Sequence, residues 1–366
     1  MKILYRNRRS ILQEKLEKRA VRATLVISPA SIAYLIGFRS DPMERFMALW
    51  IKADGTMILY IPELDETKAS MVQGIDRLVL IPDGKPATEA LRETCGGEPE
   101  RCGIEKETLT LKMAEQLAEL WPDTEFVDIG ADIGQMRGRK TRAEANLVKA
   151  AAGYADAALE AALGFFRRGM KERELAEEID RQIVLAGGAG PAFKTTVLGG
   201  ERSALPHGDT GDYGIVEGDI LLIDMGVVHE GYLSDMTRTF LVGQGTAEQE
   251  RMYETVLEAN RRAIDALQTG VTLASVDEAA RSWIRSCGYG EWFPHRVGHG
   301  LGTEIHEPPS VHGWNEQLVV TGMLLTIEPG IYIPGFGGVR IEDDLYVNED
   351  GLVEQLTGFS KPLRRI

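Results

Sequence analysis

The chain has little cysteine: among its 366 residues, only Cys95, Cys102 and Cys287 occur. The number is odd and no Cys-x-x-Cys pair is present, which argues against a disulfide framework and against a thiolate metal site. No apolar run reaches the roughly 18 residues of a membrane-spanning helix, and the charged N-terminus lacks the apolar core of a signal peptide. These absences predict a cytoplasmic protein with no membrane partner.

Positive charge is also scarce, because 41 lysines and arginines face 56 aspartates and glutamates, for a net charge of −15. The most basic run, around Arg6, Arg8, Arg9 and Arg19, is interleaved with apolar residues and glutamates, as on a solvated helix face. A chain of this charge repels nucleic acids and anionic membranes unless it carries a large basic patch, and the sequence has none. We therefore expect no nucleic-acid partner.

The length predicts two domains, and the alternation of helical and strand patterns predicts an α/β (α+β) protein. In the first domain, 1–135, an amphipathic helix is expected at 3–22 with Ile11, Leu12 and Leu16 on one face. A second helix is expected near 109–120, and Asp54-Gly55 is typical of a hairpin turn. Short apolar runs predict strands at 24–27, 33–37, 46–51, 57–61, 78–81 and 126–129. The second domain, 140–366, starts with helices expected at 141–166 and 172–185.

Two aspartates interrupt the apolar strands predicted between residues 220 and 240. If His229-Glu230 forms the centre of the turn, Asp224 lies directly opposite Asp235, with Cβ atoms about 4.5–5.5 Å apart. Two like charges at that distance destabilise a sheet unless a cation lies between them. Either aspartate alone could instead cap a strand or face water. The pair together favours a metal site.

Three further segments carry polar residues inside apolar surroundings. His295 and His299 lie among glycines, while Glu328 and Glu342 each end an apolar run. The histidine pair is not the helical His-Glu-x-x-His zinc motif, and either glutamate alone could form a strand-edge salt bridge. Together with the aspartates, the set offers four carboxylates and one imidazole without sulfur, which suits manganese or cobalt, with zinc possible. Four carboxylates favour two divalent cations over one.

The motifs around these five side chains resemble a known family. Asp224 in Leu-Ile-Asp-Met-Gly, Asp235 in Tyr-Leu-Ser-Asp-Met-Thr-Arg-Thr, His299 in Gly-His-Gly-Leu-Gly, Glu328 in Ile-Glu-Pro-Gly and Glu342 in Gly-Val-Arg-Ile-Glu-Asp are similar to the metal ligands of the dinuclear, pita-bread metallopeptidases. That family includes proline dipeptidase (prolidase), aminopeptidase P and methionine aminopeptidase. The resemblance implies a pita-bread catalytic domain at 140–366, preceded by the creatinase-like accessory domain of the proline-specific members.

The resemblance also implies roles for residues outside the ligand set. Catalysis would involve Glu328 as the group that moves the proton of a metal-bridging hydroxide, with His207 and His306 stabilising negative charge on the substrate. Substrate-binding or supporting positions would be His295, Arg340 and Tyr332. The implied reaction is hydrolysis of the bond before proline in a di- or oligopeptide, by an enzyme that forms a homodimer.

Alternatives remain open within and outside this reading. An Xaa-Pro dipeptidase is favoured, but some prolidases carry an arginine at the position of Ser310, so an aminopeptidase P acting on longer peptides is the main alternative. Methionine aminopeptidases usually lack the accessory domain, and creatinase-like members lack the ligands. A non-enzymatic peptide-binding module of the same fold is the alternative from a different class.

Overall fold

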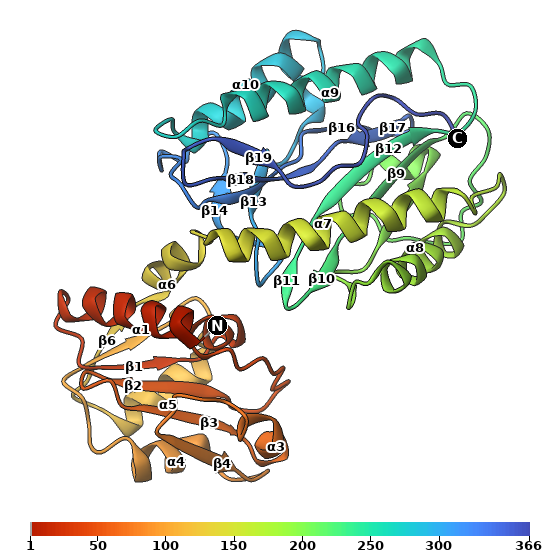
Figure 1. Ribbon diagram of the computed structural model, residues 1–366. Coiled ribbons are helices and arrows are strands. Elements are labelled where there is room, and N and C mark those ends of the chain that lie inside the picture. Colours follow the sequence, from red (N-terminus) through yellow and green to blue (C-terminus); the bar gives the residue numbers. More distant parts are fainter. Residues whose placement is uncertain (1) are drawn as a thin grey trace. The chain divides into compact units, whose positions relative to one another are not determined.

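The computed structural model describes residues 2–366, and the chain divides into two compact units, Met1–Arg137 and Gly138–Ile366 (Figure 1). Both helices and sheets are present in each unit, so the predicted fold class is confirmed. Within the described residues, no helix combines the length and the apolar character that crossing a membrane requires.

The first unit is built on one six-stranded sheet. Its strands are β1 (Ala23–Val26), β2 (Ala48–Lys52), β3 (Met57–Pro62), β4 (Arg77–Ile81), β5 (Arg101–Ile104) and β6 (Glu125–Asp128). They lie in the order β4-β3-β2-β1-β5-β6, and β2 runs antiparallel to both of its neighbours while the other pairs are parallel. The Asp54-Gly55 turn joins β2 to β3, as predicted.

Helices cover both faces of this sheet, which is why its strands are apolar at successive positions. The helices are α1 (Lys2–Glu17), α2 (Pro29–Ile36), α3 (Glu66–Ala69), α4 (Ala87–Thr94), α5 (Leu111–Leu120) and α6 (Gly130–Arg137), with a 3-10 turn at Glu63–Asp65. Along β2, Leu49 and Ile51 pack with α1 and α2, whereas Ala48 and Trp50 pack with α4 and α5 on the other face.

Two expectations for the first unit are wrong. The run 33–37 is not a strand but belongs to α2, where Ser28 accepts a bond from the backbone of Ser31 at the start and Gly37, with φ of 76°, ends the helix. Helix α1 ends at Glu17 rather than at residue 22, and Ile11 is 47% exposed instead of sharing the buried face of Leu12.

The second unit places two pairs of helices around several small sheets. The helices are α7 (Arg142–Leu163), α8 (Glu172–Ala186), α9 (Ala247–Ala266) and α10 (Leu273–Ser286), with 3-10 turns at Gly200–Ala204 and Gly290–Trp292. In Figure 1, α9 and α10 lie on one side of the strands and α7 and α8 on the other. Each pair covers its own apolar cluster. Thr141 and Glu144 cap α7 reciprocally, so this helix begins at Arg142, one residue after the predicted start.

The strands of this unit bring distant segments of the chain together. They are β7 (Gly190–Pro191), β8 (Thr196–Gly199), β9 (Ile220–Met225), β10 (Val227–His229), β11 (Tyr232–Leu233), β12 (Met236–Leu241), β13 (Gly298–Gly300), β14 (Glu307–Val311), β15 (Leu324–Ile327), β16 (Gly330–Ile333), β17 (Gly337–Arg340), β18 (Asp343–Val347) and β19 (Val353–Gln355). Their sheets have the orders β12-β9-β8, β11-β10-β7, β14-β13-β15-β18-β19 and β16-β17.

The hairpin that carries Asp224 and Asp235 has a different register from the predicted one. His229 pairs with Tyr232, so the turn is Glu230-Gly231, where both residues have positive φ (47° and 78°). Glycine adopts positive φ with little strain, so a turn centred on Glu230-Gly231 is less strained than the predicted one centred on His229-Glu230. As a result, Asp224 faces Thr237 and not Asp235. The shift is two residues, and a shift by two keeps a side chain on the same face.

Candidate metal centre

A cavity of about 400 Å³ opens in the second unit among strands that are far apart in the sequence. Nearly all of the site residues expected from the sequence line it. The lining residues are Phe193, Pro206, His207, Asp224, Asp235, His295, Arg296, His299, Ile305, His306, Glu328, Arg340 and Glu342. Tyr332, the one expected residue that is not among them, is buried and bonded to two that are.

Asp235, His299 and Glu342 form a group that could hold a metal ion. One ligand atom from each lies within 4.8 Å of the others, and all three side chains are buried. His299 Nε2 is 3.7 Å from Asp235 Oδ2 and 3.4 Å from Glu328 Oε1. The ring nitrogen of one histidine therefore faces carboxylates from two other parts of the chain, as a divalent cation requires.

The other ring nitrogen fixes the orientation of His299. Its Nδ1 lies 3.0 Å from the carbonyl oxygen of Gly300, which can only accept a hydrogen bond, so Nδ1 carries the proton. The lone pair of Nε2 is then left facing the carboxylates, which is the form that binds a metal. The neighbouring glycines allow this packing, because a Cβ on Gly298 would lie 1.9 Å from the carbonyl oxygen of Thr326.

Asp224 reaches the same cavity from β9. Its Oδ2 accepts a 2.6 Å bond from Arg340 Nη2, while its Oδ1 is buried and has no hydrogen-bond partner in the described structure. A buried carboxylate oxygen without a partner is costly and is typical of a position that awaits a ligand. Four carboxylates and the imidazole of His299 therefore meet in one cavity, and this donor set fits divalent cations. The part played by each side chain as a ligand stays a prediction.

Arg340 organises the carboxylate side of the cavity. Its Nε and Nη1 donate to Thr237 Oγ1 and Tyr332 Oη, both at 2.9 Å, and Thr237 in turn donates a 2.6 Å bond to Glu342. His295 Nε2 lies 3.0 Å from the same tyrosine oxygen. Burial opposes the charge of Arg340, but Tyr332 and the nearby carboxylates outweigh it and hold its pKa above the ordinary value. The guanidinium thus stays charged and fixes its acceptors.

The remaining histidines border the cavity. His306 packs edge-on against His299 with ring centroids 4.3 Å apart, and His207 lies on the exposed side of the lining. Burial lowers the pKa of His299 to about 3 and that of His295 to about 4, and it also lowers the pKa of His306. These imidazoles are therefore neutral at neutral pH, so they can accept or donate hydrogen bonds without adding positive charge beside a cation.

The carboxylates of the cavity are difficult to ionise together. Burial raises the pKa of Glu328 to about 7, and burial followed by repulsion from neighbouring acids raises those of Asp235 and Glu342 well above their ordinary values. Opposite charge placed among them would remove this penalty. The electrostatics of the site therefore favour the binding of cations.

The stability of the metal-free chain should depend on pH for this reason. A carboxyl whose pKa is raised on folding contributes stability that is lost as the pH rises through the folded value, since buried charge then appears without a partner. The lowered pKa of His295 and of His299 acts in the opposite sense, but only below the unfolded value of about 6.5. Between about pH 6.5 and about pH 8, the unfolding midpoint without metal should therefore fall.

Added manganese should raise that midpoint more at about pH 8 than at about pH 6.5, because the cations compete with protons for Asp235, Glu328 and Glu342. Calorimetric unfolding in manganese and in chelator at the two pH values measures the difference. An equal manganese effect at both values would contradict the electrostatic description of the cavity.

Sequence reasoning missed several residues of this site. Thr237 and Thr326 each bond a candidate ligand: Thr237 Oγ1 bonds Glu342, and Thr326 Oγ1 accepts a 3.1 Å bond from the backbone of His299. Each lies two residues from a candidate ligand at the end of its strand, so the alternation of extended chain could have placed them on the same face. Arg296 lines the cavity and was also missed.

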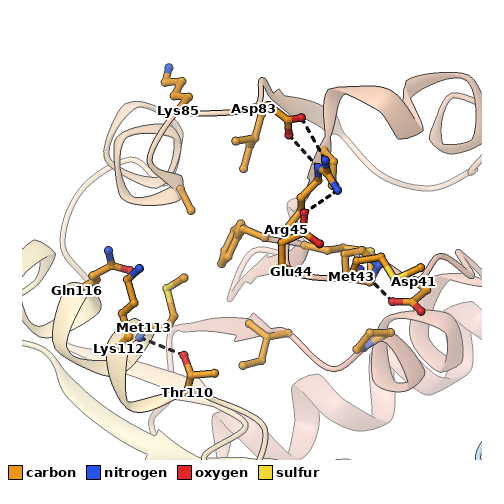
Figure 2. A pocket seen from close by; sticks show the side chains of 18 of the residues that line it. Asp41, Met43, Glu44, Arg45, Asp83, Lys85, Thr110, Lys112, Met113 and Gln116 are labelled. Atoms are coloured by element: carbon orange, nitrogen blue, oxygen red, sulfur yellow. Dashed lines mark hydrogen bonds and ion pairs between the residues drawn. The ribbon is translucent and has the colours of Figure 1, made fainter.

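A larger cavity, of about 680 Å³, lies in the first unit (Figure 2). Its lining contains no histidine or cysteine, and both acids nearest Arg45 are paired with it. Figure 2 shows Arg45 turned toward Asp83, with Nε 2.8 Å from Oδ1, and its guanidinium also contacts Glu44 at 3.0 Å. The size of a cavity therefore does not identify the reactive site of this chain.

Comparison with known proteins assigns both units. The model for "Metallopeptidase family M24" matches residues 146–349, and that for "Creatinase/Prolidase N-terminal domain" matches residues 8–138. The first of these matches contains all five candidate ligands.

Whole-length relatives agree with these matches. An uncharacterized peptidase of Staphylococcus saprophyticus is 38% identical over 352 residues, covering 96% of this chain and 99% of the relative. The structure of an Xaa-Pro dipeptidase from Bacillus anthracis superposes with a TM-score of 0.88 at 31% identity, covering 99% of this chain and 100% of that one. That of an X-Pro aminopeptidase from Thermotoga maritima gives 0.84 at 30%, covering 96% and 100%.

Proposed function

The chain belongs to metallopeptidase family M24, and from this membership we propose that it is an Xaa-Pro dipeptidase that hydrolyses the peptide bond before a C-terminal proline. The observation that carries the proposal is the convergence of four carboxylates and the Nε2 of His299 on one cavity. Similarity to an Xaa-Pro dipeptidase over the whole chain supports the choice of substrate.

Asp224, Asp235, His299, Glu328 and Glu342 would hold two divalent cations, with manganese or cobalt favoured and zinc possible. When bound, such cations polarise the scissile carbonyl and make water acidic enough to attack it at neutral pH. The side chains of the protein would move the protons. The raised pKa of Glu328 suits a group that takes a proton from the attacking water and delivers it to the departing proline nitrogen.

The histidines are placed to bind the substrate. His306 and His207 line the cavity beside the candidate ligands, where a donated hydrogen bond would stabilise negative charge on the substrate carbonyl oxygen. His295 is held by Tyr332, and Arg340 keeps Asp224 in place. Phe193, Pro206 and Ile305 add apolar surface to the same lining, which suits a pyrrolidine ring.

Hydrolysis of Ala-Pro and of Ala-Pro-Ala, with manganese present and after treatment with a chelator, tests the proposal. We expect release of proline from the dipeptide, at least about tenfold faster than cleavage of the tripeptide, and loss of both activities on chelation. Ala-Ala serves as the matched substrate without proline. A faster tripeptide would instead establish an aminopeptidase P, the second candidate, which the similarity to an X-Pro aminopeptidase keeps open.

Two broader predictions accompany the function. The chain is expected to act in the cytoplasm and to form a homodimer, as the family resemblance implies. Light scattering coupled to size-exclusion chromatography measures the second of these directly.

A further inference from the structure

Arg296 is a cation in the wall of the cavity that pairs with no carboxylate among the described residues. Its Nη1 donates a 3.1 Å hydrogen bond to the hydroxyl of Ser310, and the side chain is partly buried. The other arginine of the lining, Arg340, is 2.6 Å from Asp224. A guanidinium that is partly withdrawn from water and has no acidic partner is stabilised when a ligand supplies the anion.

The backbone places this cation next to the candidate metal centre. Ser310 lies directly opposite His299 in the β13–β14 pair, and Arg296 precedes β13 by two residues. The residues that follow them also bond: the backbone N–H of Val297 donates to the carbonyl oxygen of Val311, which holds the two segments together. Arg296 therefore lines the same cavity as His299, and Ser310, its hydrogen-bond partner, lies behind it on the paired strand.

The charge of Arg296 also reaches the catalytic residues. The pKa of His306 is lowered mainly by burial and further by this guanidinium, and the same charge opposes the effect of burial on Glu328. A bound anion at Arg296 would thus lie within electrostatic range of the group proposed to protonate the departing nitrogen.

We propose that Arg296, held by Ser310, binds the C-terminal carboxylate of the substrate and so restricts the enzyme to dipeptides. This inference rests on the proposed Xaa-Pro peptidase function. In an Xaa-Pro dipeptide the carboxylate is attached to the Cα that bears the departing nitrogen, so it stays close to the reacting bond. In a longer peptide a neutral amide takes its place, and a planar guanidinium forms its strongest paired hydrogen bonds with a carboxylate.

The proposal explains how Ser310 fits a dipeptidase. Where some prolidases carry an arginine at this position, this chain has a serine whose hydroxyl accepts a bond from an arginine of the neighbouring segment. The cation is supplied by Arg296 instead, and Ser310 orients it. Ser310 thus contributes to carboxylate binding by orienting Arg296, which carries the positive charge.

The test compares Ala-Pro with its C-terminal amide, Ala-Pro-NH2, which has nearly the same shape without the negative charge. In manganese-loaded enzyme, Arg296→Gln should lower kcat/KM for the acid about 10- to 100-fold and change that for the amide less than about threefold. The inhibition constant of L-proline should rise by a similar factor, and that of prolinamide should not. Arg285→Gln, an exposed arginine on α10, is the control with the same change of charge.

The double variant Arg296→Gln/Ser310→Arg should recover a preference for the acid, because it returns a cation to the opposite strand. An equal loss on acid and amide in Arg296→Gln would overturn the inference and leave the peptidase function intact, since the wild-type enzyme still cleaves both. If wild-type enzyme cleaves neither compound, the proposed function itself is wrong and the inference fails with it.

Discussion

Replacing Asp235 with Asn should remove cation binding from the cavity and lower kcat/KM at least about a thousandfold. Loss of a residue that merely supports a metal ligand typically costs about 10- to 100-fold, and a ligand should cost more. Asp235 Oδ2 is 3.7 Å from His299 Nε2 and belongs to the group that could hold an ion. Asparagine keeps the size of the side chain but removes its charge, and so weakens the attraction for two cations at once.

A second measurement separates this effect from misfolding. Because burial and repulsion from Glu342 and Asp224 raise the pKa of Asp235, the metal-free Asp235→Asn variant should unfold at the same temperature as wild type or higher. Manganese should then raise its midpoint much less than it raises that of wild type. Asp265→Asn, at an exposed position of α9, is the matched control. Full activity with two cations per chain in Asp235→Asn would refute its role as a ligand.

The sequence correctly predicted that Asp224 and Asp235 lie on the same face of the hairpin, although it predicted the wrong backbone register. The turn at Glu230-Gly231 shifts the hairpin by two residues, so the partner of Asp224 is Thr237. Side chains in a strand alternate with a period of two, and an error of two therefore leaves both aspartates on the cavity side. An error of one residue would have separated them. The glycine in the turn was the signal that favoured the true register.

The error at 33–37 has a different cause. Helix α2 is buried over most of its length, so the run shows no polar face and reads like a buried strand. The signals that distinguish the two lay just outside the run: Ser28 and Pro29 open the helix, and Gly37 closes it. By contrast, the predicted family and fold class are confirmed, because the motifs that carry them are contiguous in the sequence.

The bonds that orient the site could not be read from the sequence. Arg340, Thr237 and Glu342 form a chain of hydrogen bonds between segments about a hundred positions apart. Arg296 and Ser310 meet only because β13 and β14 pair. Threonine, serine and arginine are common on strands, so their type alone carries little information until the fold places them together.

Replacing Glu328 with Gln should lower kcat by about 10²- to 10⁴-fold even at saturating manganese, because the variant loses the group that carries the proton. Glu328 Oε1 lies 3.4 Å from His299 Nε2 on the cavity wall, and burial raises its pKa to about 7. Glutamine has nearly the same shape and retains an oxygen that can act as a ligand, but it cannot accept a proton at neutral pH. The KM for Ala-Pro should change much less than kcat, since Glu328 is not proposed to hold the substrate.

The pH dependence distinguishes a proton carrier from a residue that only shapes the cavity. In wild type, kcat should fall on the acidic side as Glu328 becomes protonated, at a pH below 7 because bound cations favour the ionised form. In Glu328→Gln this acidic limb should disappear from the residual activity, measured at saturating manganese with metal content determined in parallel. Glu254→Gln, on the exposed side of α9, should keep both the rate and the limb. A variant at position 328 that binds two cations and retains more than about a tenth of wild-type kcat with an unchanged acidic limb would assign proton transfer to another group, and His306 would be the next residue to test.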